Sequence, residues 1–438
     1  MPTVEDDLPS GLDPEQFSAW IFGISEPRSG AGLELAPFRG VRFDPGVVGD
    51  LASVTSPPYD LIDDAEVRRL KASDRHNIVR LILPDTTAEA GATLNRWLDE
   101  GALVSDPDPA LYVYEASENG TVRQRGLIGA LGLRAEADGV VLPHENVYPG
   151  PVRGRLALME TMQANLEPIF LVYEGGGEAV RIVDETATGA EPHTEFHADD
   201  GLTHRLWRIT DPEAHARIAT DLAPRQALIA DGHHRYATYR ALQARHDSGA
   251  FDFGLALLVD STQYPPHLGA IHRVLPGLAP AAAVEAARSV FRVTDLGKSL
   301  PEALAALTSA SGPAFLLGGG DRLHLLTDPD EQRLDQAMPE EHSPLWRRLD
   351  TAVLDRLLIE HLWDVPENEH SVEVVHDDPA AAIDRARRAG GTAVILNPLK
   401  VEDVLAVANE GERVPRKSTS FGPKPRTGLV LRLLDERS

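Results

Sequence analysis

The sequence contains no cysteine, and it lacks any long apolar run. Without cysteine there can be no disulfides, no thiolate metal sites and no cysteine nucleophile among its 438 residues. No stretch approaches the ~18 consecutive apolar residues that a membrane span needs. Residues 1–35 do not combine a basic end with an apolar segment, as a secretory signal would. We therefore expect a soluble, cytoplasmic protein with no membrane partner.

Basic residues are also scarce. The chain has 42 Lys and Arg against 68 Asp and Glu, giving a formal net charge of −26. A field of this sign repels nucleic-acid phosphates, and no helix-turn-helix with a basic recognition helix is recognisable, so we do not expect a nucleic-acid partner. A phosphorylated small molecule is still compatible, because a pocket lined by a few cations acts at short range while distant charges are screened.

The length predicts more than one domain, because a single hydrophobic core seldom serves so many residues. Residues 1–35 read as a poorly ordered N-terminal extension, 36–278 as a mixed α and β core, and 279–438 as a second α/β unit with a basic C-terminal segment. Apolar and β-branched residues predict a strand over 76–83. Asn119-Gly120 predicts a tight hairpin. The fold class that follows is mixed α/β.

Residues 227–242 form the segment around which we expect the chemistry. A short apolar strand ends at Asp231, Gly232 permits a sharp turn, and a helical pattern begins at once. Unpaired backbone N–H groups at a helix N-terminus favour anions, and His233, His234 and Arg235 add side-chain donors there. The sequence therefore predicts a phosphate site at this turn.

Three plainer interpretations of the same segment stay open. Asp231 can simply cap the helix. The adjacent His233 and His234 can be metal ligands, although no third ligand lies at a recognisable spacing and the metal is unknown. The turn can also be structural and bind nothing.

Other polar segments supply further candidates for the site. Pro57 and Pro58 restrain the backbone before Tyr59 and Asp60, although Asp60 can equally cap a helix that begins near Asp63. A polar stretch before a helix expected from about residue 154 carries His144, Glu145 and Arg153, although it can equally be a solvated loop. The stretch 413–426 holds five basic residues and no acid, which suggests that they return to the anion site, unless this is only a solvated basic loop. The five are Arg413, Arg416, Lys417, Lys424 and Arg426.

Six blocks of the sequence, taken in order over about residues 36–434, resemble the family called domain of unknown function 1015. These blocks are Ala36–Phe43, Ser56–Asp60, His76–Arg80, Leu142–Glu145, Ile229–Tyr236 and Pro415–Thr419.

The Asp231–Arg235 block is also similar to the phosphate-binding motif of the ParB and sulfiredoxin-like superfamily, which includes free serine kinases. This resemblance implies a ParB/sulfiredoxin-like core in which Gly232, His233, His234 and Arg235 bind the phosphates of a nucleotide, ATP or ADP, together with Mg²⁺. Sulfiredoxins use a cysteine in this motif, so reductase activity is set aside.

The resulting hypothesis is a nucleotide-dependent phosphotransferase acting on a small hydroxylated metabolite, with free L-serine as the first acceptor to consider by analogy. Asp60, Glu145 and Asp231 are the candidate catalytic carboxylates, and Asp60 is preferred as the base because its backbone is restrained. Tyr59, His144 and Arg153 are candidate substrate-binding residues, and Arg416 and Lys417 would close the site. The alternatives are a nucleotide-controlled switch of ParB type, without small-molecule phosphorylation, and a non-catalytic scaffold.

Overall fold

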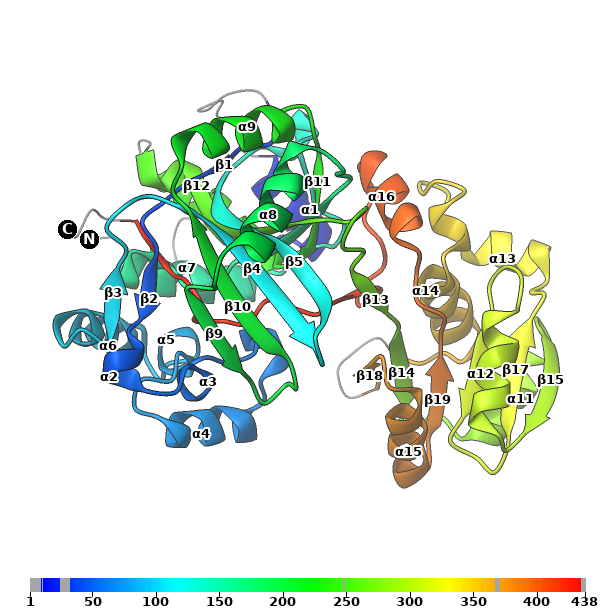
Figure 1. Cartoon of the computed structure of the whole chain (residues 1–438). Coiled ribbons are helices and arrows are strands. Elements are labelled where there is room, and N and C mark those ends of the chain that lie inside the picture. Colours follow the sequence, from blue (N-terminus) through cyan, green and yellow to red (C-terminus); the bar gives the residue numbers. More distant parts are fainter. Residues whose placement is uncertain (1–8, 10, 24–31, 247–248, 367–370, 435–438) are drawn as a thin grey trace. The chain divides into compact units, whose positions relative to one another are not determined.

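The chain divides into two compact units, of which the second is inserted into the first. A computed structural model describes residues 9, 11–23, 32–246, 249–366 and 371–434 (Figure 1). The first unit comprises Met1–Pro266 together with Pro423–Ser438, and the second comprises His267–Gly422. The division thus comes earlier than the boundary expected after residue 278. The last segment of the chain, Pro423–Ser438, belongs to the first unit, although the whole second unit precedes it in the sequence.

Nine strands in the described part of the first unit form one mixed sheet. Strands β11 and β6 pair in parallel, as do β12 and β8, and the other pairs are antiparallel. The hairpin predicted at Asn119-Gly120 is confirmed, since both residues have positive φ and join β4 to β5. In spatial order the strands are β6 (Val141–Leu142), β11 (Ala227–Asp231), β8 (Ile169–Tyr173), β12 (Phe253–Asp260), β5 (Thr121–Gly132), β4 (Leu111–Glu118), β10 (Thr203–Ile209) and β9 (Thr194–His197), with β1 (Leu35–Ala36) against β5.

Helices pack their apolar residues against this sheet in one continuous core. The helices that contribute to it are α1 (Pro14–Phe22), α7 (Pro149–Met162), α8 (Glu178–Gly189), α9 (Pro212–Leu222) and α10 (His233–Arg245). Helix α1 differs from the poorly ordered extension expected for residues 1–35. Asp13 caps it with a capping box, and Phe17, Ile21 and Phe22 are buried in the core. Residues 1–8, 10 and 24–31 of the expected extension lie outside the described residues.

Shorter helices and strands form a second hydrophobic core in the first unit. Residues 76–83, predicted as a strand, instead contain helix α5 (Val79–Ile82). The Asn77 side chain accepts a hydrogen bond from the Val79 backbone N–H at 3.0 Å and so starts a helical turn that apolar patterning alone does not reveal. The neighbouring elements are β2 (Val41–Phe43), α2 (Pro45–Val48), α3 (Leu51–Val54), η1 (Tyr59–Leu61), α4 (Asp64–Ser73), α6 (Thr87–Asp99), β3 (Leu103–Ser105), β7 (Ala164–Asn165) and β21 (Arg432–Leu433).

The second unit is built on an antiparallel sheet of six described strands. Their order is β15 (Arg292–Gly297), β17 (Leu323–Thr327), β16 (Phe315–Gly318), β19 (Thr392–Ile395), β14 (Ile271–Leu275) and β18 (Glu373–His376). Helices α12 (Leu300–Thr308) and α15 (Pro379–Ala389) contribute to its core. A separate pair joins β13 (His267–Gly269) to β20 (Ser420–Gly422). The remaining helices are α11 (Pro280–Ala287), α13 (Glu331–Ala337), α14 (Asp350–Ala352), the π-helix η5 (Val353–Leu362) and α16 (Val401–Asn409).

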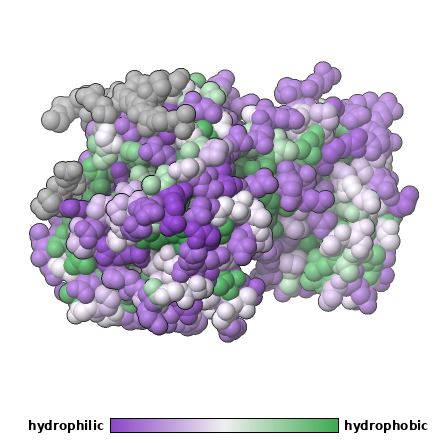
Figure 2. Space-filling model, turned by 45° about the horizontal axis from the view of Figure 1, so that its top comes forward, coloured by the Kyte–Doolittle hydropathy of each residue, from purple (hydrophilic) through white to green (hydrophobic). Residues whose placement is uncertain are grey.

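The mixed α/β class expected from the sequence is confirmed in both units. None of the helices that the structure describes is both long and apolar enough to cross a membrane. On the face drawn in Figure 2, hydrophilic residues predominate and apolar residues are scattered among them, in keeping with the strong charge of the chain.

Candidate functional site

The strand-to-helix turn predicted at Asp231-Gly232 is present between β11 and α10. Gly232 has φ 96°, and a Cβ added there would lie 3.0 Å from Ile169 Cγ2 and 3.1 Å from Arg235 Nε. Both the conformation and the close approach therefore require glycine. Gly232 itself is the N-cap of α10, and no side chain caps this helix. The alternative that Asp231 caps α10 is therefore wrong, because the Asp231 carboxylate is directed to other partners.

Arg235 is buried beside this turn and is held by two acceptors. It is 2% exposed. Its Nη2 donates to Asp231 Oδ2 at 2.5 Å, and its Nη1 donates to the Pro168 carbonyl at 2.6 Å. Burial opposes the charge, but Asp231, Glu167 and Asp60 together outweigh it and raise the pKa of Arg235, so the guanidinium stays ionised. Within the described part of the chain Nε has no hydrogen-bond partner, which leaves one donor beside Gly232.

The two histidines hold a distant loop against the start of α10. His233 Nε2 accepts from the His144 backbone N–H at 3.2 Å, and His234 Nε2 accepts from the Tyr148 backbone N–H at 3.0 Å. The His144 and His233 rings meet edge to face, 4.5 Å apart. A ring nitrogen that accepts carries no proton, so this arrangement fits neutral histidines with Nδ1 protonated. The tertiary fold thus brings the predicted His144 loop to the motif.

A lysine from the C-terminal segment joins two of the three predicted carboxylates. Lys424 Nζ lies 2.5 Å from Asp60 Oδ2 and 2.5 Å from Asp231 Oδ1. The two oxygens that share it can be no farther apart than twice that distance. Asp60 lies in η1, and Asp63, not Asp60, caps the following helix α4. The alternative of Asp60 as a helix cap is therefore wrong, and its carboxylate belongs to this cluster.

The charges in the cluster stabilise one another. Burial by itself would raise the pKa of Asp60, but Lys424 and Arg235 together lower it below its ordinary value. Burial would likewise lower the pKa of Lys424, but Asp231 and Asp60 raise it. Asp60 keeps 36% of its side chain exposed, whereas Asp231 keeps 15% and Lys424 13%. Asp60 is thus the member most open to a small molecule from solvent.

Tyr59, a predicted substrate residue, lies between two guanidinium groups. Arg155 is 4.0 Å and Arg235 5.9 Å from the centre of its ring, within the range of cation–π contacts. Burial raises the pKa of Tyr59 to about 12, although both arginines oppose this shift. The Tyr59 backbone N–H donates to Glu167 Oε1 at 3.1 Å. Glu167 therefore fixes the backbone next to Asp60.

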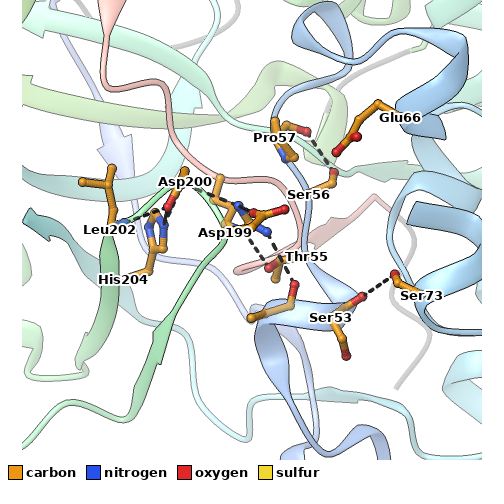
Figure 3. A network of polar contacts seen from close by, with 12 residues as sticks. Ser53, Thr55, Ser56, Pro57, Glu66, Ser73, Asp199, Asp200, Leu202 and His204 are labelled. Carbon is orange, nitrogen blue, oxygen red and sulfur yellow. Dashed lines mark hydrogen bonds and ion pairs between the residues drawn. The ribbon is translucent and has the colours of Figure 1, made fainter. Parts of the chain in front are cut away.

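The C-terminal segment that carries Lys424 is anchored by Arg426. Its guanidinium donates to Thr55 Oγ1 at 2.8 Å and pairs with Asp199 at 2.9 Å and with Asp200 at 3.5 Å. Figure 3 shows Asp199 close to Thr55, with Asp200 and His204 next to each other. Thr427 pairs through its backbone with Ser56 in both directions. The C-terminal segment is therefore fixed at Arg426, by Thr55 and the two aspartates, and at Thr427, by Ser56.

The remaining predicted site residues are Arg153, Glu145, Arg416 and Lys417. Arg153 is half-buried on α7, and Glu145 is half-buried in the loop between β6 and α7. Arg416 and Lys417 belong to the second unit, where the Arg416 carbonyl accepts from Arg273 Nη2 at 3.1 Å. Their return to the turn stays a prediction.

Sequence reasoning missed two residues of the cluster, Glu167 and Arg155, and it expected Lys424 at the site only as one of five basic residues of the C-terminal segment. Lys424 was noticed only as part of a basic stretch, although its position between Pro423 and Pro425 marks a restrained backbone. Glu167 and Arg155 carried no local signal, because their roles depend on partners more than 80 positions away or on another element. Among the described residues, no group of three or more His, Asp or Glu is arranged to hold a metal ion.

Comparison with solved structures finds only distant likenesses. A free serine kinase mutant in complex with ADP is 13% identical with a TM-score of 0.34, over 64% of this chain and 84% of that one. SbnI from Staphylococcus aureus, with a C-terminal truncation, is 13% identical with a TM-score of 0.35, over 71% and 90%. A conserved hypothetical protein from Pyrococcus furiosus is 14% identical with a TM-score of 0.32, over 64% and 87%. These values are too low to support a conclusion about function.

No curated protein matches the chain. The family resemblance carried by the six sequence blocks is confirmed, although the last block, Pro415–Thr419, lies beyond the matched span. The family model described as "Protein of unknown function (DUF1015)" matches residues 35–352, and the chain belongs to that family.

Proposed function

We propose that the protein is a nucleotide-dependent phosphotransferase that acts on a small hydroxylated metabolite. The observation that carries the proposal is the turn at Gly232. It combines a helix N-terminus that only glycine allows with the Arg235 Nε donor, which is buried beside the turn and lacks a partner in the described structure. Donors and positive dipole ends held in place are what phosphate binding and transfer require.

The carboxylates beside the turn supply the second requirement, a group that accepts the proton of the acceptor hydroxyl. Asp60 is the best placed, because it is exposed to solvent on one side and lies beside Asp231 at the turn. In the proposed reaction the hydroxyl oxygen forms a bond to the terminal phosphorus of the nucleotide. The bond from that phosphorus to its bridging oxygen breaks, the shortened nucleotide leaves with that oxygen, and the hydroxyl proton passes to Asp60.

Mg²⁺ fits the residues that are present. One carboxylate is a usual protein contribution to a Mg²⁺ site that phosphates and water complete, so Asp231 at the turn would hold the ion and Asp60 stays available as the base. Bound there, the ion would neutralise charge on the phosphates. Gly232, Arg235 and the backbone of the turn would orient the nucleotide, and Tyr59, whose ring centre lies 5.9 Å from the Arg235 guanidinium, would contact the acceptor.

The test is direct. Purified protein is incubated with ATP or ADP, Mg²⁺ and a panel of hydroxylated amino acids beginning with L-serine, and phosphate transfer is followed by phosphorus NMR. A phosphomonoester that forms only with protein, nucleotide and one acceptor supports the proposal. Nucleotide binding with hydrolysis or no chemistry would favour a switch of ParB type, and no nucleotide binding at all would favour a non-catalytic scaffold.

A further inference from the structure

Lys424 differs from every other cation of the cluster in how it is held. Its ammonium contacts two carboxylates, whereas Arg235 is fixed by one carboxylate and one backbone carbonyl. A lysine ammonium is a compact charge on a flexible four-carbon stem, and it can exchange partners without the geometric demands of a guanidinium. A lysine at this position can therefore move its charge from one partner to another.

The backbone that carries this side chain is fixed. The Pro423 carbonyl accepts from Gln124 Nε2 at 2.7 Å, just before Lys424. Two residues after Lys424, Arg426 is anchored by Thr55 and the Asp199–Asp200 pair. With prolines on both sides of Lys424, only its side chain is left to move.

The ammonium also lies next to the proposed phosphate site. It contacts Asp231, and the next residue, Gly232, opens the turn at which the phosphate would bind. The flexible stem of a lysine allows its ammonium to change partners within such a site. A phosphate bound at the turn would attract it, because charged oxygens are strong acceptors for an ammonium.

We propose that Lys424 exchanges partners when nucleotide binds: its ammonium neutralises Asp60 and Asp231 in the free protein and moves to the phosphate oxygens in the complex. This inference rests on the proposed function, and it adds a coupling within the same site. While the ammonium stays on Asp60, that carboxylate is a weak base, because a nearby cation stabilises its ionised form. After the exchange, Asp60 is available to an acceptor hydroxyl. Phosphate occupancy thus controls the base, which disfavours proton abstraction in the absence of nucleotide.

The experiment measures binding of ADP, inorganic tripolyphosphate and adenosine by calorimetry, in the full-length protein. The variants are Lys424→Met and, as a matched control, Lys71→Met. Lys71 also pairs with a carboxylate of the first unit, Asp85, at 2.8 Å, but on the exposed surface. We expect Lys424→Met to weaken ADP and tripolyphosphate by about tenfold to a hundredfold, the usual scale for losing a charged hydrogen-bond partner, with adenosine unaffected. Lys71→Met should change none of the three.

A second measurement follows the ammonium itself. In ¹⁵N-lysine-labelled protein, the Lys424 ammonium signal is identified by its loss in Lys424→Met. Tripolyphosphate should shift that signal and leave the Lys71 signal in place. Should the parent bind ADP while the Lys424 signal stays fixed and Lys424→Met binds ADP as tightly as the parent, the exchange is refuted and the proposed function survives. Should the parent bind neither ADP nor tripolyphosphate, the phosphate site itself is refuted. If Lys424→Met fails to fold, the signal is identified by its loss in Lys424→Arg, and its shift or constancy in the parent protein decides the question.

Discussion

Lys424 and Arg426 lie two positions apart on one segment, each is buried, and each faces a pair of aspartates, yet the two pairs are built differently. The Arg426 side chain is 1% exposed, and its guanidinium also bonds to Thr55 Oγ1 and, at 3.4 Å, to the Ala52 carbonyl. Lys424 is 13% exposed, and the contacts described for its ammonium are the two carboxylates. Arg426 thus anchors the C-terminal segment, whereas Lys424 places a charge beside the turn at Gly232.

This difference shows how one short segment serves both structure and chemistry. A planar guanidinium with several fixed acceptors locks the chain in one position, while an ammonium between two carboxylates can change partners at small cost. The anchor makes the exchange useful, because a lysine on a loose tail would not return to the same place. We therefore expect Arg426 to affect mainly the stability of the fold and Lys424 to affect mainly the proposed nucleotide site.

The largest expected effect is on stability, from Arg426→Ala. Removing the guanidinium leaves Thr55 and two aspartates without their cation in the interior of the first unit. Asp199 and Asp200 remain partly solvated, so we expect the free energy of unfolding to fall by about 2 to 3 kcal/mol, which is at or below the lower end of the range for a broken buried pair. The free energy of unfolding is measured by urea titration. The control is Arg69→Ala, which removes an exposed partner of Asp199 and should cost under about 1 kcal/mol. An equal loss in both variants would contradict the role of anchor.

The next effect concerns catalysis, from Asp60→Asn. The amide keeps the shape but cannot accept the hydroxyl proton, so transfer should slow by ~10²-fold or more while nucleotide affinity stays within a few-fold. Single-turnover rates and calorimetry separate the two quantities. The exposed Asp85→Asn is the matched control and should leave both unchanged. Undiminished transfer in Asp60→Asn would remove Asp60 from the mechanism.

A smaller effect is expected from Gly232→Ala, compared with Gly120→Ala. Both glycines have positive φ, 96° and 81°, so each alanine carries a backbone cost of about 1 to 2 kcal/mol. Only at Gly232 would the new methyl group also press on Ile169 and Arg235, since nothing lies within 4 Å of a Cβ at Gly120. Urea unfolding should therefore show the larger loss for Gly232→Ala, and nucleotide affinity should fall in that variant alone. Equal losses with equal affinity would mean that the turn has no special packing or binding role.

The smallest effect is the pH dependence of the Lys424 pair. The pKa of Asp60 is lowered in the folded protein, so the unfolded state binds protons more readily in acid. The stabilisation from this pair is therefore complete above the unfolded pKa of about 4 and is lost as the pH falls through the lower folded pKa. Because Asp60 is partly exposed, the stability difference between the parent and Lys424→Met should be under about 1 kcal/mol at pH 6 and should shrink below pH 4. A difference that grows in acid would contradict the assignment.

Sequence patterns were sufficient wherever the deciding interactions were local. The strand ending at Asp231, the glycine turn and helix α10 follow from apolar spacing and from the one residue type that tolerates the turn. The Asn119-Gly120 hairpin follows from the same kind of short-range chemistry. The strand expected at 76–83 failed because the side chain of Asn77 bonds to its own backbone neighbourhood and starts a helix, an interaction that competes with the pattern of apolar residues.

By itself, then, the sequence determined the mixed α/β class, the family and the position of the strand-to-helix turn at Gly232, because each depends on neighbours along the chain. Only the tertiary structure decided that Lys424 closes the pair formed by Asp60 and Asp231. Those three residues are far apart in the sequence, and the insertion of the second unit separates Lys424 from the other two. Periodicity carries no information about which distant charges will meet, since that is fixed by the packing of the sheet and by the anchoring of the returning segment.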